Sequence, residues 1–152
     1  MRNAIIFLDS GDTLVDESTE VRIKGDVVDH AEFFTGIKEV LFQLKNAGFR
    51  VALVADGLVE SFDNIYQQHE METYFEVRAI SETVGVCKPA GEMFKTAMEK
   101  MNLEEADKKY IIMIGNNLER DIVGANQMGI TSVLAGYSPR YRMKPENEEE
   151  TP

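Results

Sequence analysis

Residues 4–13 read AIIFLDSGDT, and this stretch determines how the sequence is best interpreted. Its five consecutive apolar residues predict a strand that is buried on both faces of a sheet. The next five residues, Asp9 to Thr13, are polar apart from Gly11, and they predict a turn directly after that strand. A carboxylate at the end of a buried strand can attack phosphorus, which makes Asp9 the first candidate nucleophile. The alternative is an ordinary turn residue, because aspartate is common in turns.

The rest of the chain alternates between short apolar runs and segments with helical spacing. Residues 20–28 predict a small β-hairpin that turns at Gly25. Further strands are expected at residues 50–55, 75–80, 110–114 and 130–134, and helices at residues 32–47, 59–69, 92–101 and 118–128. This order predicts an α/β fold, a doubly wound, Rossmann-like parallel sheet of five strands with a small hairpin flap. Ligands bind such sheets beyond the carboxyl ends of the strands, where Asp9, Asp56 and Asn116 follow.

Composition indicates one folded domain and limits the kinds of partner. The chain has 152 residues, 43% of them hydrophobic, and a formal net charge of −11. This size and hydrophobic content predict one domain over residues 1–137. Residues 138–152 contain three prolines and an acidic run, so we expect a flexible acidic tail there. The excess of acidic residues argues against nucleic acid and anionic membranes as partners.

The sequence also favours a cytoplasmic location. Cys87 is the one cysteine, so an intramolecular disulfide is excluded, which fits a reducing compartment. The apolar run at residues 4–8 is too short for the core of an export signal. No apolar stretch is long enough to span a membrane.

Four further residues have side chains suited to phosphate chemistry. The hydroxyl of Thr13 can donate to a phosphate oxygen. Lys88, restricted by the proline that follows it, can neutralise a phosphate or an ionised Asp9. Asn116 and Asp121 offer hard oxygen ligands of the kind that Mg²⁺ prefers. The structural alternatives are a turn hydrogen bond, a solvated lysine and two helix caps.

Taken together, these segments resemble the haloacid dehalogenase superfamily. The first motif of that family, an apolar strand ending in Asp-x-Asp-x-Thr, is matched at Asp9 and Thr13. The third motif, a lysine often followed by proline, is matched at Lys88. The fourth, Gly-Asp-x-x-x-x-Asp, is similar to residues 115–121, and residues 20–28 look like the family's flap. The resemblance covers residues 4–137.

The resemblance implies a Mg²⁺-dependent phosphohydrolase or phosphotransferase that forms an aspartyl-phosphate on Asp9. The substrate is then a phosphorylated small molecule or macromolecule. The implied catalytic residues are Asp9, Thr13 and Lys88. The implied phosphate-binding residues are Ser10, Asp56, Gly57 and Lys88. The implied ligands of Mg²⁺ are Asp9, the backbone carbonyl of Gly11, Asn116 and Asp121.

The departures from the family pattern bear on the activity. Gly11 replaces the second aspartate of the first motif, which is the general acid and base of the family's phosphatases, and Asp12 is expected to point elsewhere. Loss of this general acid should slow turnover most for substrates that have poor leaving groups. Ala55 stands where the family has a serine or threonine, so a phosphate-binding hydroxyl is missing. Asn116 stands where the family has an aspartate, so the metal site has one negative charge fewer. The absence of an inserted cap domain implies a large substrate, or a second copy of the chain that covers the open site.

Three alternatives remain beside the phosphohydrolase. The changes at Gly11, Ala55 and Asn116 fit a catalytically weak or inactive member that binds a ligand or a protein. A phospho-receiver is disfavoured, because the strand expected at residues 75–80 is followed by Ser81 rather than by an aspartate. Dehalogenation is disfavoured, because that branch of the family usually has a cap.

Overall fold

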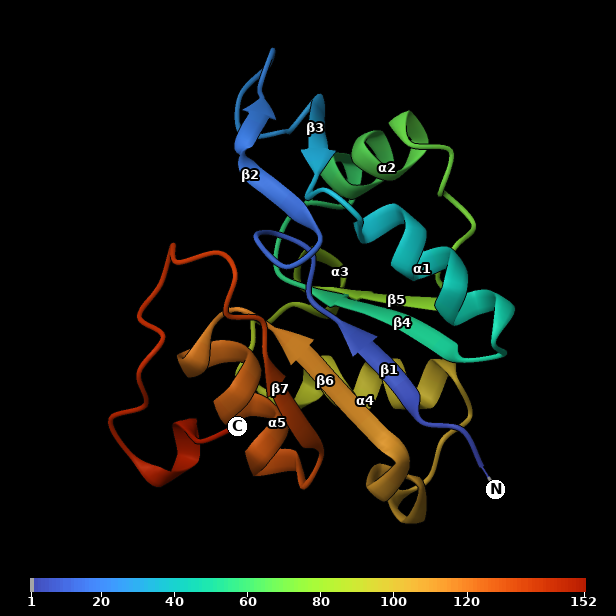
Figure 1. The fold of residues 1–152 in the computed structure, drawn as a ribbon, viewed down its shortest axis with the longest axis vertical. Coiled ribbons are helices and arrows are strands. Elements are labelled where there is room, and N and C mark those ends of the chain that lie inside the picture. Colours follow the sequence, from blue (N-terminus) through green and yellow to red (C-terminus); the bar gives the residue numbers. More distant parts are fainter. Residues whose placement is uncertain (1) are drawn as a thin grey trace.

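A parallel sheet of five strands forms the centre of the computed structural model, which describes residues 2–152 (Figure 1). Its strand order is β5-β4-β1-β6-β7. The strands are β1 Ile5–Leu8, β4 Arg50–Ala55, β5 Val77–Ile80, β6 Ile111–Gly115 and β7 Thr131–Leu134. In the central strand, Ile5 pairs in register with Arg50 on one side and with Ile111 on the other. The predicted five-stranded parallel sheet is confirmed.

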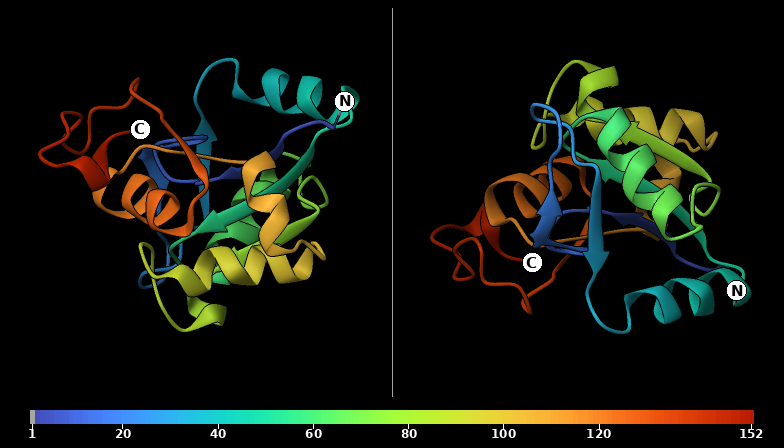
Figure 2. Two further views of the ribbon diagram at one scale, coloured as in Figure 1. Left: turned by 90° about the horizontal axis from the view of Figure 1, so that it is seen from below. Right: turned by 90° about the horizontal axis from the view of Figure 1, so that it is seen from above.

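Helices cover both faces of this sheet. The helices are α1 Ile37–Asn46, α2 Val59–Gln68, α3 Ser81–Val84, α4 Gly91–Lys100 and α5 Val123–Met128, with a 3-10 helix, η1, at Glu105–Tyr110. Ile6 and Leu8 of β1 belong to the apolar core shared with α1 and α2. The alternate residues Ile5 and Phe7 belong to the core shared with α4 and α5. The left view of Figure 2 shows α1 and α4 on opposite sides of the sheet.

The hairpin flap is longer than the sequence indicated. It consists of β2 Val15–Val21 and β3 His30–Phe33, which pair antiparallel and form a separate two-stranded sheet. The flap stands beyond the carboxyl end of β1 (Figure 1). The helix expected from residue 32 begins only at Ile37, because residues 30–33 pair with β2 instead. Between β1 and β4 the chain contains this flap and α1, and no cap domain is evident there.

The helix expected over residues 118–128 begins with a wider turn. Leu118–Ile122 form a π-helical turn, η2, and α5 follows directly. The carbonyl of Asn117 accepts from the backbone N–H of Asp121 at 2.8 Å and of Ile122 at 3.3 Å. The side chain of Asn117 caps the turn by accepting from the N–H groups of Glu119 and Arg120. Such wide turns occur often at functional sites.

The C-terminal residues 138–152 lie against α5 and contain a short 3-10 helix, η3 Glu148–Glu150. Arg142 forms an ion pair with Glu150 at 2.8 Å. The side-chain amide of Asn126 donates to the carbonyls of Glu149 and Thr151, each at 2.8 Å. These contacts define one position for the segment, and the flexibility expected from its composition stays a prediction. No helix among residues 2–152 is long and apolar enough to cross a membrane.

Replacing Arg142 by alanine should release this C-terminal segment. Hydrogen bonds from Arg142 lower the pKa of Glu150 to about 2, so the pair stabilises the docked segment above the ordinary carboxyl pKa. That contribution is lost as the pH falls from about 4.5 toward about 2. We therefore expect Arg142→Ala at pH 7, and the wild type near pH 2, to lose amide exchange protection at residues 146–151. Lys144→Ala is the matched control, and equal protection in the two variants would contradict the docking by Arg142.

Candidate active site

Three charged side chains meet at the carboxyl ends of the central strands. Asp9 follows β1 directly, and its backbone N–H continues the sheet by donating to Ile114 at 3.0 Å. The ammonium Nζ of Lys88 lies 2.9 Å from Asp9 Oδ1 and 2.6 Å from Asp121 Oδ1. It also donates to the carbonyl of Val54 at 2.8 Å. The structure thus brings together three of the side chains that the sequence singled out.

Thr13 holds the other oxygen of Asp9. Its hydroxyl donates to Asp9 Oδ2 at 3.1 Å and lies 3.5 Å from Asn116 Oδ1. The turn that carries Thr13 is closed by the Ser10 carbonyl, which accepts from three successive backbone N–H groups, those of residues 13, 14 and 15. Each oxygen of the Asp9 carboxylate therefore has its own donor, so the orientation of the group is fixed.

Lys88 is a buried cation surrounded by carboxylates. Its side chain is only 1% exposed. Burial lowers the pKa of Lys88, but the carboxylates of Asp121, Asp9 and Asp56 outweigh it and raise the pKa above its ordinary value. Lys88 is consequently charged at neutral pH, as a group that binds phosphate must be.

Asp121 and Asn116 are both buried at the site, each about 1% exposed. Burial raises the pKa of Asp121, and the charge of Asp9 adds to this effect, whereas Lys88 lowers it. Asp121 Oδ2 also accepts from the backbone N–H of Asn117 at 3.0 Å. A Cβ at Gly115 would overlap the carboxylate of Asp121, so only glycine fits at the end of β6. The Nδ2 atom of Asn116 has no hydrogen-bond partner among residues 2–152.

The residues expected to bind phosphate have different surroundings. The hydroxyl of Ser10 is buried and bonded to the hydroxyl of Tyr66 at 2.8 Å, in the core under the turn. Asp56 Oδ1 accepts from the backbone N–H of Lys88 at 2.9 Å. Gly57 has a φ of +150°, which favours glycine, and its N–H donates to Ser81 at 2.8 Å. In this arrangement Asp56 holds the backbone of Lys88 in place, and Asp56 and Gly57 both border a cavity.

Asp12 points away from Asp9, as its place in the turn predicted. Its carboxylate is 2% exposed and accepts from the backbone N–H of Glu17 at 3.0 Å. The second oxygen of Asp12 forms an ion pair with Arg140 of the C-terminal segment. The hydroxyl of Tyr137 also donates to the carbonyl of Thr13. The motif turn is thus fixed by contacts from the flap and from the C-terminal end of the fold.

Glu17 lies at the site, although no sequence motif singles it out. It belongs to β2 of the flap, and its carboxylate fills the space that a side chain at Gly11 would need. A Cβ at Gly11 would overlap Glu17 Oε1 and fall 2.8 Å from Glu17 Cδ. Burial, Asp12 and Glu20 raise the pKa of Glu17 to about 7, whereas Arg140 lowers it. No motif spacing identifies this contact, because it depends on how the flap folds over the turn.

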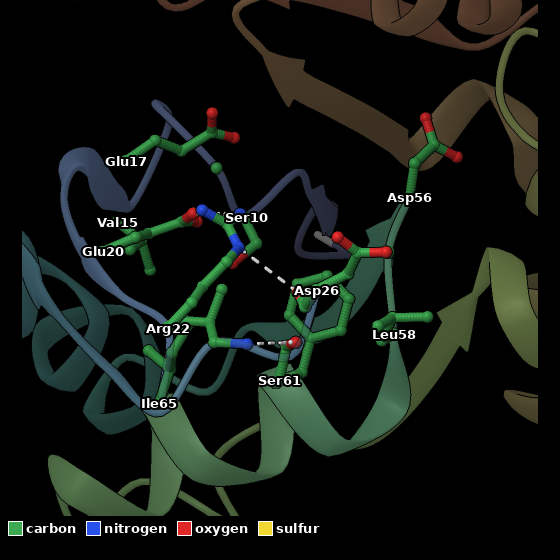
Figure 3. A pocket seen from close by; sticks show the side chains of 14 residues that line it. Ser10, Val15, Glu17, Glu20, Arg22, Asp26, Asp56, Leu58, Ser61 and Ile65 are labelled. Atoms are coloured by element: carbon green, nitrogen blue, oxygen red, sulfur yellow. Dashed lines mark hydrogen bonds and ion pairs between the residues drawn. The ribbon is translucent and has the colours of Figure 1, made fainter. Parts of the chain in front are cut away.

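Two cavities meet at this point. The smaller, of about 60 Å³, is bordered by Asp9, Lys88, Asn116, Asp121 and Tyr141. The larger, of about 270 Å³, lies between the flap and α2 (Figure 3). It is lined by Val15, Arg22, Val28, Leu58, Ser61 and Ile65, among others. Gly11, Glu17 and Asp56 border both cavities.

The family of haloacid dehalogenase-like hydrolases has a sequence model that matches residues 10–135. The chain belongs to this family. It is 33% identical over 103 residues to the glyceraldehyde 3-phosphate phosphatase of Pyrococcus abyssi, covering 67% of this chain and 42% of the relative. It is 28% identical to pyrophosphatase PpaX of Halalkalibacterium halodurans, covering 72% of this chain and 49% of the relative. The chain therefore spans less than half the length of these two relatives.

Solved structures of haloacid dehalogenase-like proteins share the fold. A phosphatase from Thermococcus onnurineus superposes with a TM-score of 0.76 at 14% identity, covering 92% of this chain and 89% of that one. The hydrolase YfnB from Bacillus subtilis, which was solved with magnesium, superposes with a TM-score of 0.71 at 14% identity. That match covers 87% of this chain and 88% of YfnB. The family model and the 33% identical relative confirm the superfamily resemblance inferred from the sequence motifs, and these solved structures share its fold.

Proposed function

We propose that this haloacid dehalogenase-like chain hydrolyses or transfers the phosphoryl group of a phosphorylated small molecule through an aspartyl-phosphate on Asp9. The observation that carries this proposal is the fixed carboxylate of Asp9, with Lys88 on one oxygen and Thr13 on the other. The position of Asp9 in the sheet also supports the proposal. Asp9 follows β1, which lies where the strand order reverses, and ligands bind at that point in doubly wound sheets.

Each side chain has a separate task in the reaction. An oxygen of Asp9 attacks phosphorus, and the bond from phosphorus to the leaving oxygen breaks. The charged Lys88 and the hydroxyl of Thr13 are prepositioned donors for the phosphoryl oxygens, whose negative charge they stabilise during transfer. Attack by water on the aspartyl-phosphate releases inorganic phosphate and restores Asp9. Attack by another hydroxyl would complete a phosphotransfer instead.

The donor atoms at the site fit Mg²⁺. Asp9, Asp121, Asn116 and the backbone carbonyl of Gly11 border the smaller cavity and offer hard oxygen ligands. The unpartnered Nδ2 of Asn116 is a hydrogen-bond donor and not a ligand of Mg²⁺, so it is available to donate to an oxygen of the phosphoryl group. Within residues 2–152 there is no group of three or more His, Cys, Asp or Glu side chains suited to a metal. The amide oxygen of Asn116 and the carbonyl oxygen of Gly11 are therefore needed to complete the set of ligands. Bound Mg²⁺ would offset charge on the phosphoryl oxygens.

Replacing Asn116 by aspartate should strengthen Mg²⁺ binding. The substitution adds one negative charge among the proposed ligands, and a unit charge at ligand distance in a buried site corresponds to roughly tenfold or more in affinity. Mg²⁺ titration followed by calorimetry measures this without any substrate. Asn117→Asp, which changes the charge of the neighbouring helix cap, is the matched control. Equal affinity in the wild type and Asn116→Asp would remove Asn116 from the ligand set.

The size of the larger cavity and the names of the relatives support a small substrate. About 270 Å³ is enough for a leaving group of a few carbon atoms. Relatives of this chain are named glyceraldehyde 3-phosphate phosphatase and pyrophosphatase. Coverage of the site by a second copy of the chain stays a prediction, although Tyr141 of the same chain already borders the smaller cavity.

The test is Mg²⁺-dependent release of phosphate from an acyl phosphate, an aryl phosphate and glyceraldehyde 3-phosphate. We expect turnover that saturates with substrate and disappears when Mg²⁺ is chelated. The activated acyl phosphate should react in any case, because it has the best leaving group. Absence of Mg²⁺-dependent turnover with all three substrates would contradict the proposed function.

A further inference from the structure

Gly11, in the turn after β1, borders both cavities but has no side chain that could give a proton to a leaving group. An alkoxide is a poor leaving group, and transfer to Asp9 is fast only when its oxygen receives a proton. Ser10 is bonded to Tyr66 in the core, and Asp12 is paired with Arg140 and borders neither cavity. The hydroxyl of Thr13 is directed at Asp9. None of these three side chains is free to protonate a leaving oxygen.

Glu17 fills this vacant position from the flap. The backbone of Gly11 does not have a positive φ, so its conformation would accept a side chain, and it is the carboxylate of Glu17 that excludes one. The backbone N–H of Glu17 is held by Asp12 at 3.0 Å, and Glu17 Oε2 lies 3.4 Å from Arg140. The carboxylate is therefore directed into the site and is not simply a surface charge of the flap.

Glu17 also lies between the expected positions of the phosphoryl group and the leaving group. It borders the smaller cavity, which contains Asp9 and Lys88, and the larger cavity between the flap and α2. The phosphoryl group belongs in the first cavity and the leaving group in the second, so the bond that breaks lies where the two meet. We propose that Glu17 is the general acid and base of this chain, acting in place of a side chain at Gly11. This proposal rests on the proposed function of Asp9.

The two half-reactions balance with water as the other reactant. In the first, an oxygen of Asp9 bonds to phosphorus while the bond to the ester oxygen breaks, and the ester oxygen takes the proton of the Glu17 carboxyl. In the second, water attacks phosphorus and the Glu17 carboxylate takes a proton from that water. The bond between Asp9 and phosphorus then breaks, which returns the Asp9 carboxylate and leaves Glu17 protonated.

The first experiment compares leaving groups in Glu17→Gln. We expect turnover of glyceraldehyde 3-phosphate, which has an alkoxide leaving group, to fall by about 10²–10⁴-fold. Phosphorylation of Asp9 by an acyl phosphate needs no proton donor, so its rate in a single turnover should change less than about threefold. Hydrolysis of the aspartyl-phosphate should slow with either substrate, because Glu17 is the base of that step. The control is Asp16→Asn on the same strand, whose carboxylate bonds to Ser18 at 2.6 Å and borders neither cavity. This control should match the wild type with both substrates.

The second experiment moves the carboxylate back to the turn. Gly11→Asp alone should perturb the site, because its Cβ would overlap Glu17. Combined with Glu17→Ala, the same substitution has room, and we expect turnover of glyceraldehyde 3-phosphate to rise at least about tenfold above that of Glu17→Ala. A loss of turnover in Glu17→Ala that this carboxylate reverses, with no change in the thermal unfolding midpoint, identifies the loss as that of a proton donor and not of the fold. Thermal unfolding midpoints identify any variant that fails to fold. If Glu17→Gln does not fold, the comparison of Glu17→Ala with the double variant serves as the test.

The outcomes separate this proposal from the function on which it rests. If acyl phosphate turnover is retained and Glu17→Gln matches the wild type with glyceraldehyde 3-phosphate, Glu17 is not the acid but the proposed function stands. A wild type that hydrolyses only the activated ester overturns the role of Glu17 in the same way. If the wild type hydrolyses neither ester, both the proposed function and the role of Glu17 are overturned.

Discussion

Asp9→Asn should lower turnover of phosphate esters and of the activated acyl phosphate alike, by a factor of at least about 10⁴. The amide is nearly the same size as the carboxylate, but it is a poor nucleophile toward phosphorus. Because Lys88 keeps its contact with Asp121 at 2.6 Å, the variant should still fold. Phosphate release from acyl and aryl phosphates measures the effect.

Asp16→Asn is the matched control for this prediction. It makes the same chemical change on the neighbouring flap strand, where the side chain bonds only within its own turn to Ser18. Activity of this control should equal that of the wild type. If Asp9→Asn retained turnover at the wild-type level with a normal unfolding curve, another group would have to be the nucleophile.

Lys88→Met should impair both catalysis and folding. The substitution removes the donor from Asp9 Oδ1 and the positive charge that faces the phosphoryl group, so we expect a loss of about 10²–10³ in turnover. It also leaves the carboxylates of Asp9 and Asp121 facing each other without a cation. Breaking a buried ion pair by removing one partner typically costs about 3–5 kcal/mol in the free energy of unfolding.

The loss of stability in Lys88→Met should depend on pH. Burial and Asp9 already raise the pKa of Asp121, and without Lys88 this pKa should rise further. A carboxyl group whose pKa is raised by folding favours the folded state at low pH and loses that effect as the pH increases through the raised pKa. In urea unfolding with EDTA present, the deficit relative to the wild type should therefore be smaller at pH 5 than at pH 8. Lys95→Met, an exposed lysine on α4, is the control, and a deficit that grows at low pH would contradict the prediction.

The sequence predicted the sheet and the centre of the site for the same physical reason. Apolar runs such as residues 4–8 identify buried strands, and parallel strands end at one edge of a sheet. Residues just past those ends, such as Asp9 and Asn116, therefore lie near one another whatever the details of the helices. Lys88 was found through its motif, and the structure adds that Asp56 holds its backbone.

Features that depend on tertiary packing were not predictable from local patterns. The contact of Glu17 with Gly11 depends on the pairing of the flap strands, whose register shifts between Asp16 and Val21, and no spacing in the sequence encodes it. The π-helical turn before α5 has the same hydrophobic spacing as an ordinary helix, yet it brings Asp121 against Gly115. The pairing of Ser10 with Tyr66 joins residues that are far apart in the sequence.

Acid quenching should trap the phosphoryl group on Asp9, which would show directly that this residue is the nucleophile. The wild type is incubated with Mg²⁺ and an acyl phosphate, quenched in acid, and digested for mass spectrometry, with Asp9→Asn treated in parallel. We predict a phosphorylated wild-type peptide that contains Asp9, lability of that modification to hydroxylamine, and no such peptide in the variant. Steady turnover of the acyl phosphate with no modification at Asp9, or with the modification at another residue, would contradict the account.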